Sequence, residues 1–250
     1  MGGAMELVAP AGTPLALQAA VANGADAVYV GLHDLSARAY AGNFTLRELA
    51  AGVDVARRAG VRVYVTLNTL VREGEVEVAR ALLCGAADAG ASAVIVQDLA
   101  YLALRDAVAP GLPVHASTQM ALHTAAGLAR LGAAGVARCV LPRELSLRDI
   151  TALTAGDTAA LPELEVFVSG AMCYAMSGLC LASGLTTGRS GNRGRCHQPC
   201  RGAFRGSGGE DLGHIFSLAD LWAWPLLPRL ARLGVRAIKL EGRLRSAAYV

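Results

Sequence analysis

The sequence predicts an α/β fold, a TIM-type (β/α)8 barrel, from three observations. Short apolar runs alternate with helical stretches eight times along the 250 residues. Most of these runs are apolar throughout, as in parallel strands that are buried on both faces. The first run ends in Ala-Pro-Ala-Gly (9–12), which lacks the three-glycine spacing of a dinucleotide-binding loop. The barrel is therefore favoured over its main competitor, an open doubly wound sheet.

The eight expected strands are short apolar runs bounded by turn-forming or polar residues. After the eighth run only eight residues remain, so the last helix of the barrel is expected to be missing or truncated. The predicted strands are Glu6–Ala9, Ala27–Gly31, Arg62–Asn68, Ala93–Asp98, Pro113–Ser117, Ala137–Pro142, Glu165–Gly170 and Ala237–Gly242.

Helix signals fill the gaps between the strands. Thr13 followed by Pro14 reads as an N-cap with proline at the first helical position. The segment Thr45–Glu48 reads as a capping box, and Ser146–Asp149 and Ser217–Asp220 are weaker versions. Glycines shortly before the next strand are expected to end the helices; they are Gly24, Gly60, Gly90, Gly132 and Gly234.

The whole chain, 1–250, is expected to form one barrel domain, with the loop 170–214 as a cysteine-rich insertion after strand seven. Such a long loop at the C-terminal face of a barrel is where function usually lies. No apolar run approaches the roughly 18–20 residues of a membrane span. The N-terminus does not resemble a secretory signal. We therefore expect a cytoplasmic protein with reduced thiols.

Four cysteines of the insertion are the strongest chemical signal: Cys173, Cys180, Cys196 and Cys200. Clustered thiols form either disulfides or a metal centre, and a cytoplasmic location favours metal. The spacing C-x6-C-x15-C-x3-C fits zinc ribbons poorly and suits an iron–sulfur cluster better, although zinc and no metal remain alternatives. Cys84 and Cys139 stand alone in apolar surroundings and are expected to be inert core thiols.

The insertion is also rich in arginine, with five between residues 189 and 205 and no acidic residue. This stretch is either a solvated loop or a clamp for phosphate or carboxylate groups. His197, beside Cys196, is a candidate for tuning a metal centre. His115, within a strand, is expected to be a core residue.

Polar residues at the C-terminal ends of the strands point at the mouth of a barrel, or cap the following helices. Glu241 and Arg243 are the strongest of these candidates, since Glu-Gly-Arg places two charges beside the mouth. Neither a G-x-S-x-G elbow nor an H-E-x-x-H helix is present. The full set is Asn68, Gln97, Asp98, Ser117, Thr118, Gln119, Arg143, Glu144, Glu241 and Arg243.

Several blocks resemble the peptidase family U32, the collagenase-like peptidases, and the resemblance runs from about residue 6 to the end. The segment EVFVSGAMCYAMSGLCLAS (165–183) closely resembles the family signature, and GRSGNRGRCHQPCR (188–201) resembles its next block. Further similar blocks are 37–45, 115–120, 141–146 and 239–243.

The resemblance implies an oxygen-independent hydroxylation enzyme acting on RNA bases or on ubiquinone, with a 4Fe-4S cluster on cysteines and prephenate as oxygen source. For this chain we expect a nucleobase of tRNA or rRNA as substrate. Cys173, Cys180, Cys196 and Cys200 would bind the cluster. Arg193, Arg195 and Arg201 would bind phosphate or a dicarboxylate donor, and Glu241, Arg243 and Asp98 would act in catalysis.

Some relatives take the fourth ligand from a cysteine after Ser-x-x-Asp-Leu, where this chain has Trp222; Cys200 is therefore the expected fourth ligand. Many relatives have a histidine at the position of Ser169, and Ala182 is a further departure. Relatives continue past the Glu-Gly-Arg block, so RNA- or partner-binding parts are expected in a further C-terminal segment or a second subunit. A collagenase-like peptidase and a non-catalytic scaffold are the alternative functions.

Overall fold

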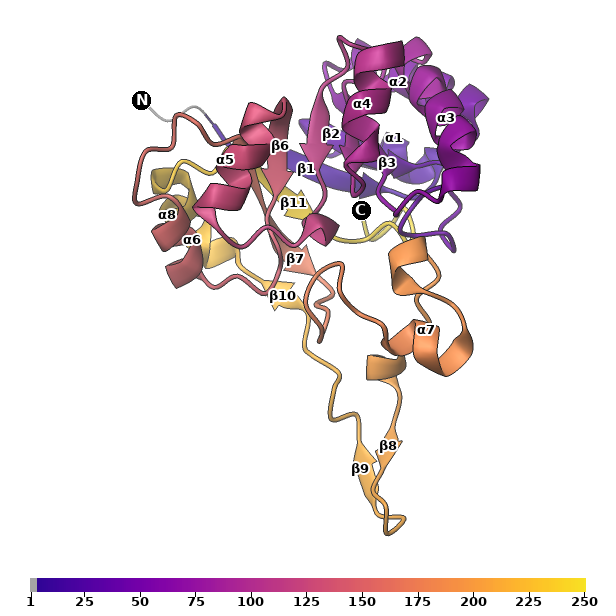
Figure 1. Ribbon diagram of the computed structural model, residues 1–250, viewed down its shortest axis with the longest axis vertical. Helices are drawn as coiled ribbons and strands as arrows, with labels where there is room; N and C mark the ends of the chain where they lie inside the picture. Colours follow the sequence, from indigo (N-terminus) through magenta and orange to yellow (C-terminus); the bar gives the residue numbers. More distant parts are fainter. Residues whose placement is uncertain (1–3) are drawn as a thin grey trace.

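A computed structural model describes residues 4–250 and contains a closed barrel of eight parallel strands in that range (Figure 1). The predicted TIM-type barrel is confirmed. The order around it is β7-β11-β1-β2-β3-β4-β5-β6, and pairing of β6 with β7 closes it. The strands are β1 (Glu6–Ala11), β2 (Ala27–Gly31), β3 (Arg62–Leu67), β4 (Ala93–Val96), β5 (Val114–Ala116), β6 (Val136–Val140), β7 (Glu163–Gly170) and β11 (Ala237–Leu240).

Each connection between successive barrel strands carries a helix, and the predicted caps are present at three of them. Thr13 accepts a hydrogen bond from the Ala16 amide (3.2 Å). Capping boxes form at Thr45 and Ser146. The helices are α1 (Pro14–Ala22), α2 (Leu46–Arg58), α3 (Val76–Asp88), α4 (Ala100–Val108), α5 (Ala125–Ala133), α6 (Leu147–Leu153) and α8 (Leu227–Arg232).

Two local predictions were wrong. Ser217–Asp220 begins no helix, because the next residues form β10 (Leu221–Trp222), which pairs antiparallel with the end of β7. Gly132 lies inside α5, and the left-handed residue that follows this helix is Gly135 (φ 84°). Both errors arise where the backbone conformation depends on packing that a short motif does not encode.

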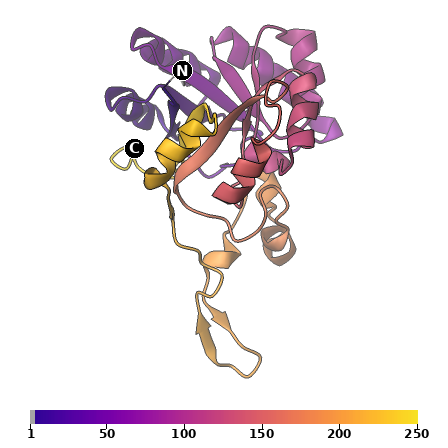
Figure 2. The same cartoon turned by 90° about the vertical axis from the view of Figure 1, so that its left-hand side faces the viewer.

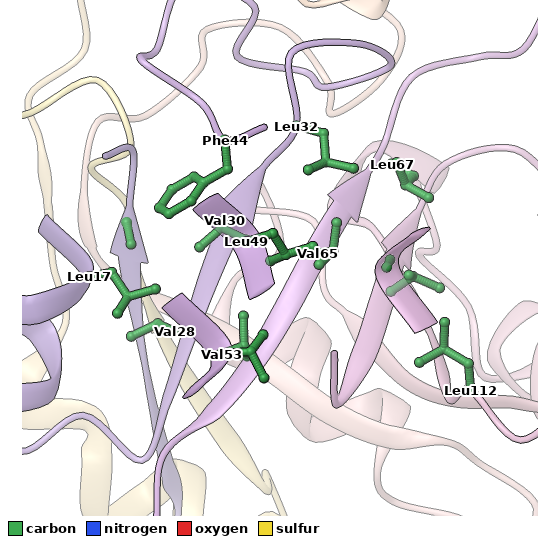
Figure 3. Close-up of a cluster of buried hydrophobic side chains, with 14 of the residues drawn as sticks. Leu17, Val28, Val30, Leu32, Phe44, Leu49, Val53, Val65, Leu67 and Leu112 are labelled. Atoms are coloured by element: carbon green, nitrogen blue, oxygen red, sulfur yellow. The ribbon is translucent and has the colours of Figure 1, made fainter. Parts of the chain in front are cut away.

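The main core lies between the sheet and its helices. Figure 3 shows part of it, where Leu17, Leu49 and Val53 of the helices meet Val28 and Val65 of the strands. These side chains are at most 3% exposed. This apolar layer holds the strands in register and so fixes the positions of the loops that follow them.

The barrel interior is polar at its centre. Glu165 is fully buried and pairs with Lys239 (2.7 Å) and Arg138 (3.3 Å). His115 packs edge-on against Tyr64 (4.8 Å between ring centroids). Burial lowers the pKa of His115 to about 3, so the ring is neutral at physiological pH and is a core residue, as predicted.

The segment between β7 and β10, residues 171–220, is named the arm. It leaves the barrel and projects away from it in both views (Figures 1 and 2). It contains α7 (Ala182–Thr187) and the hairpin of β8 (Phe204–Arg205) and β9 (Asp211–Gly213). After β11, residues 243–250 form turns and no helix, as expected. Among residues 4–250, none of the helices has the length and apolar character needed to cross a bilayer.

Candidate functional site at the barrel mouth

Arg243 occupies the C-terminal end of the barrel, and its side chain is buried. Its Nη1 donates to Ser36 Oγ (2.9 Å) and Thr66 Oγ1 (2.7 Å). Gly31, at the end of β2, makes room for it, because a Cβ at Gly31 would lie 2.3 Å from Nη1. Burial lowers the pKa of Arg243 to about 10, so the guanidinium keeps its charge at neutral pH. The mouth therefore holds a rigid cation.

Glu241 is the carboxylate of this mouth, and Arg38 from the loop after β2 pairs with it (3.1 Å). Burial favours the neutral acid, but the positive charges of Arg38 and Arg143 hold the pKa of Glu241 below its ordinary value. Burial opposes the charge on Arg38 as well, yet Glu241 keeps the pKa of Arg38 raised. With Arg243, three guanidinium groups act on one carboxylate, so positive charge is in excess.

Arg143 follows β6 and lies over the Phe167 ring (4.1 Å). Its Nη1 donates to the Ala171 carbonyl (2.7 Å), while burial and Arg38 lower its pKa. In the part of the chain that the structure describes, Nε of Arg143 is buried without a partner, and so are the side-chain oxygens of Gln97 and Asn43. Buried polar atoms normally have partners. Such atoms at strand ends are the ones that a polar ligand would satisfy.

The arm is docked on this mouth by two glycines in left-handed conformations. A Cβ on Gly178 (φ 75°) would lie 1.9 Å from the Gln119 carbonyl oxygen. A Cβ on Gly194 (φ 74°) would lie 2.1 Å from the Ser36 carbonyl oxygen. The Ala39 amide also donates to the Gly194 carbonyl (3.1 Å). These close approaches need glycine, and they hold the cysteine-bearing segment against the loops after β5 and β2.

The structure places all four predicted cluster ligands on the arm. Cys173, Cys180, Cys196 and Cys200 are free thiols, exposed or partly exposed. Burial and the nearby thiols of Cys173 and Cys180 raise the pKa of Cys196. Arg201, next to Cys200, donates to the carbonyl of the residue before Cys173 (2.8 Å). The first and last cysteine segments are therefore tied together beside the mouth.

Six free thiols leave the disulfide alternative without support. Within residues 4–250, no group of three or more His, Cys, Asp or Glu side chains is arranged to hold a single metal ion. A tetrahedral zinc site needs four donors that converge on one ion. In a four-iron cube each thiolate binds a different iron, so the sulfurs stand farther apart. The chemistry of the donor set suits a cluster, and a 4Fe-4S centre stays a prediction.

Of the two remaining cysteines, Cys139 is a core thiol as predicted, whereas the prediction was wrong for Cys84. Cys139 is fully buried in β6, and burial raises its pKa to about 12. Cys84 lies in α3 and is partly exposed.

The arginines predicted to bind phosphate or a dicarboxylate have mostly structural partners. Arg193 pairs with Glu75 in the connection before α3. Arg201 donates to Ser217 Oγ (2.9 Å) and to two backbone carbonyls. Arg195 is exposed. Of these three side chains, Arg195 is therefore the one most open to an anion.

Asp98 lies at the end of β4, where both carboxylate oxygens accept backbone hydrogen bonds. The donors are the amides of Val71 and Ala100, each at 2.9 Å. These contacts anchor the loop after β3 and the turn that precedes α4. The structure gives Asp98 a local anchoring role and brings Glu241 and Arg243 together with arginines from other loops.

Arg38 and Arg143 are the functional candidates to which sequence reasoning assigned no anion-binding role. Arg143 stands among the polar residues at strand ends, and Arg38 lies in the block 37–45. Their convergence on Glu241 depends on barrel closure, which brings loops after β2, β6 and β11 to one place. The resulting mouth can bind a carboxylate or phosphate and orient it beside the four thiols.

Comparisons with known proteins identify the family of this chain. The family model described as Peptidase family U32 matches residues 12–250. The chain is 37% identical to the 23S rRNA 5-hydroxycytidine C2501 synthase of Escherichia coli (strain K12), covering 98% of this chain and 37% of that protein. It is 35% identical to the tRNA hydroxylation protein P1 of Bacillus subtilis (strain 168), over 98% of this chain and 60% of that protein. The chain thus spans less than two thirds of the length of these relatives.

Two further similarities concern the peptidase name and the fold. The Collagenase of Porphyromonas gingivalis (strain ATCC BAA-308 / W83) is 34% identical over 98% of this chain and 62% of that protein. Among solved structures, the U32 peptidase Mk0906 superposes with a TM-score of 0.60, covering 97% of this chain and 94% of that one, at 15% identity. At that identity the superposition supports the barrel fold alone.

Proposed function

This chain belongs to the peptidase family U32, and from this premise we propose that it hydroxylates a nucleobase of tRNA or rRNA without molecular oxygen. The observation that carries the proposal is the docking of a four-cysteine arm on an arginine-rich barrel mouth. Relatives at 35–37% identity are named for hydroxylation of tRNA and rRNA. A redox centre and an anion pocket side by side are what such a reaction needs.

We propose that Cys173, Cys180, Cys196 and Cys200 hold a 4Fe-4S cluster, which supplies one-electron transfer when bound. The close backbone approaches at Gly178 and Gly194 keep the arm over the mouth. A reacting base placed there is within reach of both the mouth and the cysteines. The protein contributes position, and the chemistry of electron transfer belongs to the cofactor.

The mouth is proposed to bind the oxygen donor, a dicarboxylate such as prephenate. Arg38, Arg143 and Arg243 offer forked donors that match carboxylates, and their excess positive charge over Glu241 stabilises a dianion. In overall balance, the base exchanges a C–H for a C–OH, losing two electrons, and the donor exchanges its C–OH for a C–H, gaining them. Binding of the donor by these arginines would orient its hydroxyl toward the base.

A peptidase is the second candidate, favoured by the relative named Collagenase. It requires a nucleophile and a base within hydrogen-bond reach. The acidic and basic groups of the mouth form the Arg38–Glu241 pair instead (3.1 Å). The hydroxylation proposal accounts for all four clustered cysteines, whereas a peptidase would use at most one of them as a nucleophile.

Mass spectrometry of nucleosides from cellular RNA tests the proposal. A strain that lacks this protein should lose one hydroxylated nucleoside. Wild type and Cys84→Ala should restore it, and Cys173→Ala should not. Unchanged nucleosides in the deletion strain would contradict the proposal, and cleavage of a collagen peptide that is lost in a single point variant of the purified protein would favour the peptidase.

A further inference from the structure

An exposed aromatic and cationic cluster lies where the loop after β2 meets the arm. Tyr40 is 54% exposed, and its ring centroid lies 6.1 Å from that of His197, with the planes at 58°. Arg189 Nη1 donates to His197 Nε2 (2.6 Å). All three side chains are exposed. We name Tyr40, His197 and Arg189 the Tyr40 platform; apart from the metal-tuning role suggested for His197 by its position beside Cys196, no role assigned above uses these side chains.

The platform joins two parts of the chain that are far apart in the sequence, and backbone contacts hold them together. The Ala39 amide donates to the Gly194 carbonyl (3.1 Å). The His197 amide donates to Ser183 Oγ (2.9 Å), a buried side chain of α7. The backbone on each side is thus fixed before a ligand arrives. Such preorganisation reduces the ordering cost of binding.

The chemistry of the platform fits an unpaired nucleotide. Aromatic rings and planar guanidinium groups stack on nucleobases, and cations bind the phosphates. The stretch 189–205 carries five arginines and no acid, and Arg195 adds a second exposed cation. An acidic peptide would use the charges but leave the Tyr40 ring without a partner. A base in a duplex has its faces covered by its neighbours, so the match is to a single-stranded segment.

The position of the platform relates it to the mouth. His197 follows Cys196 directly, and Tyr40 lies two residues after Arg38, which pairs with Glu241. We propose that Tyr40, His197 and Arg189 bind an unpaired nucleotide of the RNA substrate by stacking and phosphate contact, next to the nucleotide that enters the mouth. This inference rests on the proposed function and adds a substrate-binding site to it.

Fluorescence anisotropy with a labelled single-stranded RNA tests the platform, with a blunt duplex of the same length for comparison. Tyr40→Ala should bind the single strand roughly 5- to 150-fold more weakly than wild type, because one base–aromatic stack is lost. Tyr40→Phe should restore the affinity. The slope of log K against log salt is negative, and Arg189→Ala should make it shallower by about 0.7, as expected for the loss of one phosphate contact with a single strand. Arg58→Ala, an exposed residue at the end of α2, is the matched control and should change neither quantity.

A second measurement does not depend on the alanine variant. In Tyr40→Trp, the single strand should quench the fluorescence of the added tryptophan. This quenching should exceed any change in the fluorescence of the two native tryptophans that wild type shows with the same RNA. Equal affinity of Tyr40→Ala and wild type for the single strand would overturn the platform. If Tyr40→Ala also changed the oligomeric mass while RNA affinity stayed the same, the ring would be assigned to a protein contact instead. If Tyr40 proves irrelevant while the hydroxylated nucleoside still depends on Cys173, the platform fails and the proposed function stands. Absence of RNA binding by wild type would overturn both.

Discussion

Replacing Glu241 by glutamine removes the one carboxylate that offsets three arginines at the barrel mouth. Loss of one partner from a buried ion pair costs about 3–5 kcal/mol of unfolding free energy. Here the Glu241 side chain is 13% exposed and that of Arg38 is 30% exposed, so the lower end, about 3 kcal/mol, is expected. For a chain of this size that corresponds to a fall in Tm of roughly 6–12 °C. Glutamine has nearly the same shape as glutamate, so the loss of unfolding free energy reports the loss of the negative charge.

Urea unfolding followed by circular dichroism measures this difference. The pKa of Glu241 is depressed in the folded protein. The stabilisation is therefore complete above the unfolded value of about 4.3 and is lost as pH falls through the folded pKa. The gap between wild type and Glu241→Gln should close in that acid range.

Asp220→Asn provides the control, because Asp220 pairs with Arg245 at 3.9 Å with both side chains about half exposed. It should cost less than about 1 kcal/mol. Sulfate should raise the Tm of Glu241→Gln more than that of Asp220→Asn, since the uncompensated arginines then bind the anion. A Glu241→Gln protein as stable as wild type, with no added response to sulfate, would refute the charge balance described for the mouth.

Three further predictions concern the arm, the mouth and the barrel interior. Gly194→Ala should detach the arm and expose it to trypsin, because the added Cβ would lie 2.1 Å from the Ser36 carbonyl oxygen. Gly188 is also left-handed, but a Cβ there would have nothing within 4 Å. Gly188→Ala should therefore cost only about 1–2 kcal/mol in backbone strain and keep the arm docked. Arg143→Met should weaken binding of a dicarboxylate roughly 10- to 150-fold in calorimetry, as for one lost charged hydrogen bond; equal affinity would remove Arg143 from the site. The folded pKa of His115 is about 3, so wild type should lose about 2 kcal/mol between pH 7 and pH 5 as the unfolded chain takes up a proton; His115→Gln should lack this loss in urea titrations, and an identical pH profile would contradict the assignment.

The barrel could be predicted from the sequence because its signals are local. All eight strands were found as apolar runs, and Thr45 and Ser146 formed the expected capping boxes. The Ser217 motif failed because pairing of Leu221 with Gly170 in β7 is a long-range contact that overrides a local helix signal. Short polar motifs specify the start of a helix only where the residues that follow are free to adopt a helical conformation.

The site was predicted in its parts but not in its geometry. The cysteines and the Glu-Gly-Arg charges were identified by residue type and position. The pairing of Arg38 with Glu241, 203 residues apart, appears only once the barrel has closed. Conversely, Arg193 reads as an anion ligand in the sequence, but the fold places Glu75 against it. Charge in a sequence shows where cations are, and the fold determines which of them are free.

The four cysteines of the arm are proposed to hold an iron–sulfur cluster over the arginine mouth. Anaerobic reconstitution followed by iron and sulfide analysis tests it most directly. About four iron and four sulfide per chain are expected for wild type, with a visible absorption band that bleaches on reduction. A variant with Cys173, Cys180, Cys196 and Cys200 all replaced by serine should fold and bind none. Wild type without iron, or a quadruple variant that binds as much, would contradict the account.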